Sequence, residues 1–75
     1  MQKLKEKLRS LNFSELDCIN FRRNYHNCSI YITPHNLKNS FVCINRIKSQ
    51  QDIEDVKEAY NQLQRFLKEL EQCQD

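Results

Sequence analysis

Residues 50–73 read QQDIEDVKEAYNQLQRFLKELEQC, and this stretch decides the fold. Its apolar residues recur at alternating steps of three and four, the spacing that keeps one stripe of an α-helix facing one partner. Ser49 precedes the stripe and Asp52 follows three residues later, an acidic variant of the capping box that favours a helix start. The pattern therefore predicts one long amphipathic helix. Its stripe consists of Ile53, Val56, Tyr60, Leu63, Leu67 and Leu70.

The width and length of this helix indicate what covers it. Ala59 and Phe66 lie beside the stripe and widen it beyond the seam of a two-stranded coiled coil, which suits packing on a sheet. A helix over residues 50–73 is about 36 Å long, whereas a six-residue strand is about 20 Å long. The excess length predicts a further contact, either with a second helix of the chain or with a second copy of it.

The preceding residues complete an α+β pattern. Residues 2–11 continue a leucine stripe from Met1 and predict a short helix, with Asn12 as its stop signal. Three segments then have strand character. They are residues 18–23, 28–33 and 41–47, separated by a turn at 24–27 and a polar loop at 34–40. We predict a single α+β domain over residues 1–75, with a three-stranded antiparallel sheet and the short N-terminal and long C-terminal helices on one of its faces.

The composition excludes several classes of site. The chain has 75 residues and no glycine, so phosphate-binding loops, dinucleotide fingerprints, EF-hand loops and nucleophile elbows are absent. Its turns must rely on asparagine, which tolerates the left-handed region. No apolar run approaches the roughly 18 residues of a membrane span, and the first residues lack the apolar centre of a signal peptide. We therefore expect a cytoplasmic protein with reduced cysteines and no membrane contact.

Metal binding and catalysis have little support in the sequence. His26, Cys28, His35 and Cys43 could supply four ligands, but their spacing matches no common zinc module. Cys43, like Cys18, reads as a small buried residue of a strand. A Cys–His pair would lack both an oxyanion hole and an orienting third residue. We expect no metal, no cofactor and no enzymatic activity.

The charges are divided unevenly along the chain. Residues 1–48 carry nine bases and three acids, whereas residues 49–75 carry three bases and seven acids. The acidic helix face, Glu54, Asp55 and Glu58, would compete for a basic nucleic-acid groove if the chain mimics nucleic acid.

The strand region suggests a binding surface. If both helices cover one face of the sheet, Tyr31 with Val42 or Ile44 would form an apolar centre on the other face, with arginines at its rim. The candidate partner-binding residues of this face are Arg22, Arg23, Tyr31, Val42, Ile44 and Arg46. We expect a small non-enzymatic interaction protein that binds another protein, plausibly an inhibitor from a phage or mobile element, of the anti-CRISPR or another anti-defence type. A homodimer is a further expectation, because the excess length of the long helix could be covered by a second copy of the chain.

The alternative is a nucleic-acid-binding module that uses the basic strand region. There, cations such as Arg22 and Arg23 would meet phosphates and aromatic rings would stack on bases. The predicted order of elements is also that of double-stranded-RNA-binding domains, a similarity of order alone. The glycine- and lysine-rich opening of their last helix is missing here. Its place is taken by Gln51, Asp52, Glu54 and Asp55, and the carboxylates among them would repel phosphate.

Overall fold

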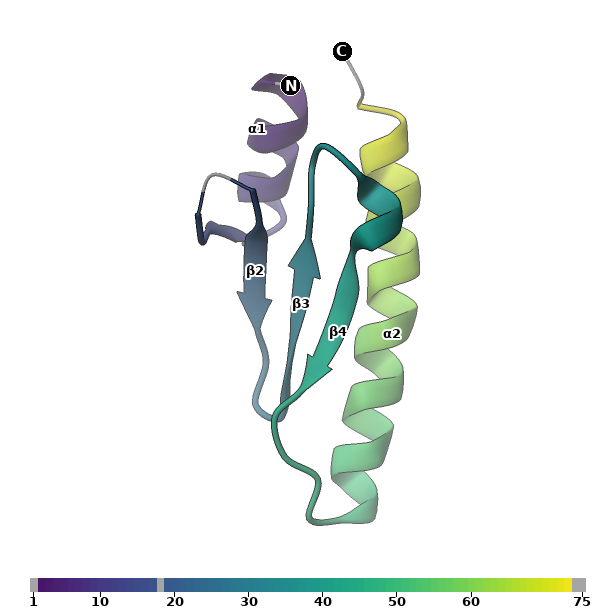
Figure 1. Ribbon diagram of the computed structural model, residues 1–75. Helices are drawn as coiled ribbons and strands as arrows, with labels where there is room; N and C mark the ends of the chain where they lie inside the picture. The colour runs from purple at the N-terminus through teal and green to yellow at the C-terminus, as the bar shows by residue number, and fades with distance from the viewer. Residues whose placement is uncertain (1, 18, 74–75) are drawn as a thin grey trace.

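Figure 1 shows the computed structural model of the chain, which describes residues 2–17 and 19–73. The fold is α+β, as the sequence predicts, with a short helix first, an antiparallel sheet in the middle and a long helix last. In chain order the elements are α1 (Gln2–Ser10), β1 (Ser14–Glu15), β2 (Phe21–Asn24), β3 (Cys28–Ile32), the short 3-10 helix η1 (Leu37–Asn39), β4 (Phe41–Ile44) and α2 (Gln50–Glu71).

The sheet has four antiparallel strands in the order β1-β2-β3-β4, one more than predicted. The extra strand is β1, whose two residues are too few to show an alternating pattern. The first predicted strand also starts later than expected, because Asp17 closes a turn in front of it. The Asp17 carboxylate accepts hydrogen bonds from the backbone amides of Ile19 (2.7 Å) and Asn20 (2.8 Å). These two bonds hold the pKa of Asp17 below its ordinary value, and the bond from the Ile19 amide has the larger effect. Cys18, where we placed the strand's start, lies outside the described residues.

Helix α2 packs its apolar stripe against the sheet. The buried side of the helix is turned slightly from the predicted one, so that it includes Ala59 rather than Tyr60. Ser49 caps it as expected, with its Oγ accepting the Asp52 amide at 3.3 Å. Ala59 is buried (1% exposed), whereas Tyr60 is 46% exposed on the flank of the buried stripe. The buried residues of α2 are Val56, Ala59, Leu63 and Leu70. Three of these four, Val56, Leu63 and Leu70, belong to the predicted stripe, but the burial expected for Tyr60 is wrong.

Helix α1 meets the C-terminal half of α2, so the chain itself supplies the predicted second helix (Figure 1). Leu4 and Leu8 are fully buried in the core. The helix ends at Ser10, and Asn12 in the turn that follows has a positive φ of 67°, the one described residue that does. Phe13 then packs edge to face on Phe66 of α2, with ring centroids 5.5 Å apart. Both helices therefore lie on the same face of the sheet, as predicted.

The turn between β2 and β3 is fastened to α2 by Asn27, which is completely buried. Its Nδ2 donates to the Asp52 carboxylate at 3.0 Å and to that of Asp55 at 3.4 Å. The backbone carbonyl of Asn27 accepts hydrogen bonds from the backbone amides of Asn45 and Arg46, in the connection between β4 and α2. This asparagine thus joins three segments through hydrogen bonds. The left-handed backbone that we predicted for asparagine turns is found at Asn12 instead.

Candidate protein-binding face

The sheet has one face without a helix, which we call the open face. Successive side chains of a strand point to opposite faces. Ile30 and Val42 lie directly opposite each other on β3 and β4, and both are buried towards the helices. Their neighbours must therefore point the other way. The register sets Arg22, Tyr31 and Phe41 in one row across β2, β3 and β4 on the open face.

An aromatic pair forms the centre of this row. The rings of Tyr31 and Phe41 are stacked, with centroids 5.0 Å apart and planes 6° from parallel. Tyr31 is half-buried, whereas Phe41 is 50% exposed at the edge of the sheet. Because each ring uses one face to contact the other, the ring edges and the outer side of Phe41 are left for another molecule. Such a rigid aromatic pair beside an arginine has the composition of an interface centre.

Polar residues border the aromatic pair and are already bonded within the chain. The Ser29 hydroxyl donates a hydrogen bond to the side-chain carbonyl of Asn24 at 2.8 Å and accepts one from the side-chain amide of Asn45 at 3.5 Å. At the other end of the strands, Thr33 donates to Asn20 at 2.9 Å. These bonds fix the borders of the open face. The aromatic row is therefore the part of the face with surface left to bind a partner.

Two of the predicted site residues share the open face, but Arg23 does not. As the neighbour of Arg22 on β2 it points to the helix side. Its guanidinium donates to the Leu11 carbonyl at 3.2 Å and lies over the rings of Tyr25 and Phe66, at 5.2 and 5.5 Å. Arg23 thus holds the end of α1 to β2 and α2. The two adjacent arginines that we grouped from the sequence do not form one basic surface.

The predicted residues of β4 also separate. Val42 is 9% exposed and belongs to the core, so it is not on the open face as one of our two alternatives had it. Ile44 is 49% exposed, but it lies opposite the buried Cys28 and on the helix side of the strand. Arg46 is exposed in the connection that follows. Phe41 was not among the predicted site residues, because β4 is apolar on both faces and only its register with β3 places Phe41 beside Tyr31 on the open face.

The acidic face of α2 is exposed and locally compensated. Glu54 pairs with Lys57 at 3.9 Å, and Glu58 pairs with Arg65 at 3.5 Å. Asp55 accepts hydrogen bonds from Asn27 and from Gln51. The predicted acidic residues therefore lie on one exposed side of α2, each with a partner from its own chain.

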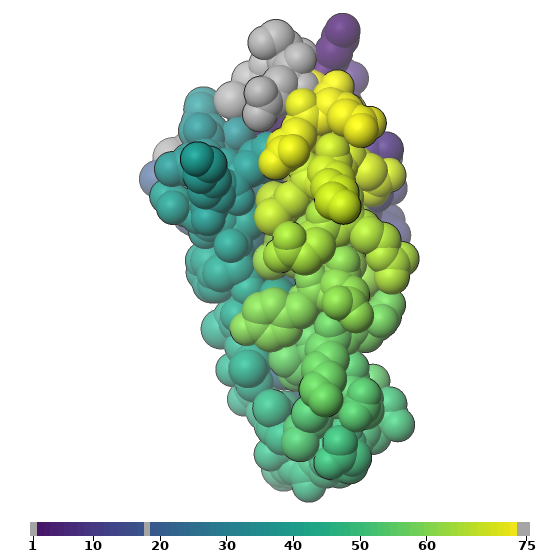
Figure 2. Space-filling model, turned by 90° about the vertical axis from the view of Figure 1, so that its right-hand side faces the viewer, coloured from purple at the N-terminus to yellow at the C-terminus, as the bar shows by residue number. Residues whose placement is uncertain are grey.

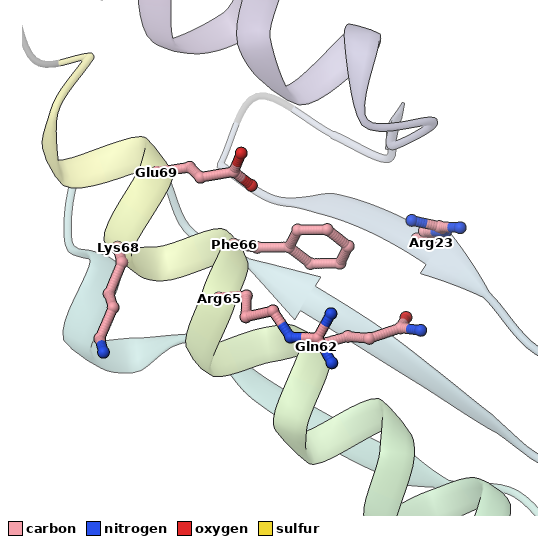
Figure 3. A pocket seen from close by; sticks show the side chains of 6 residues that line it. All are labelled: Arg23, Gln62, Arg65, Phe66, Lys68 and Glu69. Carbon is pink, nitrogen blue, oxygen red and sulfur yellow. The ribbon is translucent and has the colours of Figure 1, made fainter.

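A hollow of about 470 Å³ lies between α2 and β2, on the helix side of the molecule (Figure 3). In this view Phe66 points from α2 towards Arg23, whereas Lys68 points away from the ring. Glu69 at its upper rim pairs with Lys7 of α1 at 3.8 Å. The charged groups nearest the ring are thus engaged with the protein itself, and the hollow offers a ligand few free groups. It is lined by Arg23, Gln62, Arg65, Phe66, Lys68 and Glu69.

Metal-binding, nucleophilic and membrane-spanning features were each sought in the described part of the chain. Within residues 2–17 and 19–73, no three His, Cys, Asp or Glu side chains gather in a way that could hold a metal ion. Burial raises the pKa of the Cys28 thiol, which disfavours the thiolate that a nucleophile requires. Over the same residues, no helix combines the length and apolar character needed to cross a bilayer.

Comparison with known proteins gives no relative for this chain, since no family model, no curated protein and no solved structure matches it. Its function must therefore be inferred from its own residues and their arrangement.

Proposed function

We propose that this protein works by binding another protein through the open face of its sheet. The single observation that carries the proposal is the stacked pair of Tyr31 and Phe41 on a sheet face that neither helix covers. Aromatic side chains supply large contact areas at little cost in conformational entropy, and arginine beside them is common in interface centres. Arg22, directly opposite Tyr31 in the register, provides that arginine.

The arrangement favours a protein partner over nucleic acid. Stacking on each other leaves Tyr31 and Phe41 fewer free ring faces for bases than a single-strand platform requires. Arg22 also lacks the support of Arg23, whose guanidinium is engaged on the opposite face. Nucleic-acid binding through the basic strand region is therefore the weaker proposal of the two.

The specific form that we propose is a non-enzymatic inhibitor from a phage or mobile element, of the anti-CRISPR or another anti-defence type, acting in a cytoplasm. This part of the proposal is supported by the small size and glycine-free composition of the chain. It is also consistent with the free thiols of Cys28, Cys43 and Cys73, since free cysteines are usual in reducing compartments.

Affinity capture from a host lysate, with and without nuclease, tests the proposal. We expect a protein partner that remains bound after nuclease treatment. The variant Phe41→Ser removes the most exposed ring of the pair and should weaken binding of that partner about 10-fold or more. Arg22→Ser should weaken it in the same direction.

The matched control is Ile19→Ser, which removes an apolar side chain of similar exposure (54%) from the turn between β1 and β2. Capture should be unchanged in this control. Recovery of nucleic acid alone, or a protein partner that binds all three variants equally, would contradict the proposal.

A further inference from the structure

A second surface, separate from the open face, lies where α2 and β4 run side by side (Figure 2). Each residue of a helix turns the chain by about 100°, so residues seven apart share one flank. Ile53, Tyr60 and Leu67 form such a flank on α2, with Ile53 and Leu67 half-buried and Tyr60 46% exposed. Ile44 at the end of β4 and Ile47 beyond it are also about half exposed. We call this surface the edge patch: Ile44, Ile47, Ile53, Tyr60 and Leu67.

Contacts at both sides of α2 show which way this flank faces. Glu71, four residues after Leu67, lines a hollow together with Leu37 and Lys38 of η1. The opposite flank carries Phe66, which packs on Phe13 near α1. The flank with Tyr60 therefore faces the β4 side of the molecule, where the sheet ends.

The β4 strand is an open edge of the sheet. It is last in the strand order, so half of its backbone amides and carbonyls point away from β3. Its sequence, Phe41–Ile44, contains none of the lysine or proline residues that commonly protect such edges. A short edge of four residues without lysine or proline, beside an apolar helix flank, is a surface that a second polypeptide can complete.

We propose that the partner on the edge patch is a second copy of this chain, related by a two-fold axis. The patch is complementary to itself under that symmetry. Tyr60 lies near the middle of α2 (Gln50–Glu71), with Ile53 and Leu67 seven residues away on either side. Two α2 helices that pack antiparallel about Tyr60 bring Ile53 of one copy against Leu67 of the other, and the same contact recurs by symmetry.

Charge favours the same arrangement. Lys48 lies just before α2 and Glu71 is its last residue, and both side chains are exposed. An antiparallel pair of helices sets Lys48 of each copy near Glu71 of the other, whereas a parallel pair would bring like charges together. These two end charges therefore favour the antiparallel dimer.

The dimensions set an upper limit on this interface. The molecule extends 41 × 22 × 20 Å, so its whole side along α2 projects to about 800 Å². One partner contributes about 800 Å² to an interface of standard size, so the dimer must bury most of this side. In Figure 1 the middle of β4 is level with the middle of α2, so one two-fold axis can relate both elements to their copies. The two sheets then continue into each other, and both open faces lie on one side of the dimer.

Sedimentation of the purified chain under reducing conditions tests this inference without any partner. We expect a mass about twice the 9.1 kDa of the monomer at protein concentrations of about 0.1 mM. Tyr60→Glu and Ile44→Lys should each weaken dimerisation about 30-fold or more, because both place a charge in the interface centre. The control Ile19→Lys adds the same charge at a similarly exposed site near the other edge of the sheet and should leave dimerisation within about 3-fold of the parent.

A charge exchange separates the interface from any effect on folding. Lys48→Glu should weaken dimerisation, and the double variant Lys48→Glu with Glu71→Lys should restore it. A parent protein that stays monomeric at about 0.1 mM overturns the inference, as does a dimer that survives both Tyr60→Glu and Ile44→Lys. Since these variants leave Phe41 and Arg22 intact, failure of the dimer leaves the proposed function untouched. Because Phe41 belongs to the β4 edge, sedimentation of Phe41→Ser is measured beside its partner capture, and loss of capture by a variant that still dimerises separates the two surfaces.

Discussion

The variant Asn27→Asp tests how the turn between β2 and β3 is held to α2. The side chain keeps its shape but loses its two N–H donors and gains a negative charge. Asn27 is completely buried, and its Nδ2 lies 3.0 Å from the Asp52 carboxylate and 3.4 Å from that of Asp55. The substitution therefore replaces charge-assisted hydrogen bonds with repulsion between carboxylates, and it places the new charge on a side chain that is itself completely buried.

The expected effect is large for so small a protein. Loss of the hydrogen bonds alone, as in Asn27→Ala, should lower the free energy of unfolding by about 1.5–3 kcal/mol. An uncompensated buried charge adds about 3 kcal/mol or more. A chain of 75 residues has a total stability of roughly 4–11 kcal/mol, so Asn27→Asp should remove half of it or more at neutral pH.

Urea denaturation followed by far-UV circular dichroism measures both variants, and pH separates the two contributions. Burial and neighbouring carboxylates raise the pKa of the introduced carboxyl, so its penalty is present above that raised pKa and is relieved as the pH falls below it. Lowering the pH from neutral to about 5 should bring Asn27→Asp closer to Asn27→Ala in stability. If Asn27→Asp is as stable as the parent protein at neutral pH, the buried position of Asn27 beside Asp52 is wrong.

Three further predictions concern α2 and the turn before β2. Leu63→Ala should lower the free energy of unfolding by about 2–5 kcal/mol, whereas Tyr60→Ala should lower it by less than about 1 kcal/mol when both are measured in dilute monomeric protein by urea denaturation. Ser49→Ala removes the N-cap acceptor and should cost about 1 kcal/mol in the same assay, while Ser49→Asp should restore most of it. The lowered pKa values of Asp17 and Asp52 mean that both carboxylates stabilise the fold above the ordinary pKa of 3.8 and that this stability is lost as the pH falls through the lowered values. Acid titration of the thermal midpoint should show this loss, and Asp17→Asn should reduce its slope; an unchanged slope would count against the turn.

The long helix was predictable because its signals are local. Its start depends on Ser49 and its period on side chains within the same segment, so neither needs knowledge of the rest of the fold. Which residues of the helix face the core, by contrast, depends on how the helix packs on the sheet. Ala59 rather than Tyr60 faces the core because the helix lies close to the sheet, where a methyl group fits and a ring can remain at the side. Helical spacing alone does not distinguish these two neighbours.

The candidate site was only partly predictable for similar reasons. The sequence of β4 is apolar on both faces, so alternation could not show whether Phe41 or Val42 points to the helices. The register with β3 decides it, by placing Val42 beside Ile30. The role of Arg23 depends on Leu11 and Phe66, which are far away in sequence, and no local pattern reveals such contacts.

The central claim is that the aromatic pair of the open face contacts a protein partner. The most direct measurement is the NMR spectrum of the aromatic side chains during titration with the captured partner, followed at a protein concentration where the oligomeric state is constant. We expect the ring signals of Tyr31 and Phe41 to shift or broaden in proportion to the partner bound, while those of Phe66 on the helix side change little. Unperturbed Tyr31 and Phe41 rings in a saturated complex, with the changes confined to residues around Glu54 and Glu58 on α2, would contradict the claim.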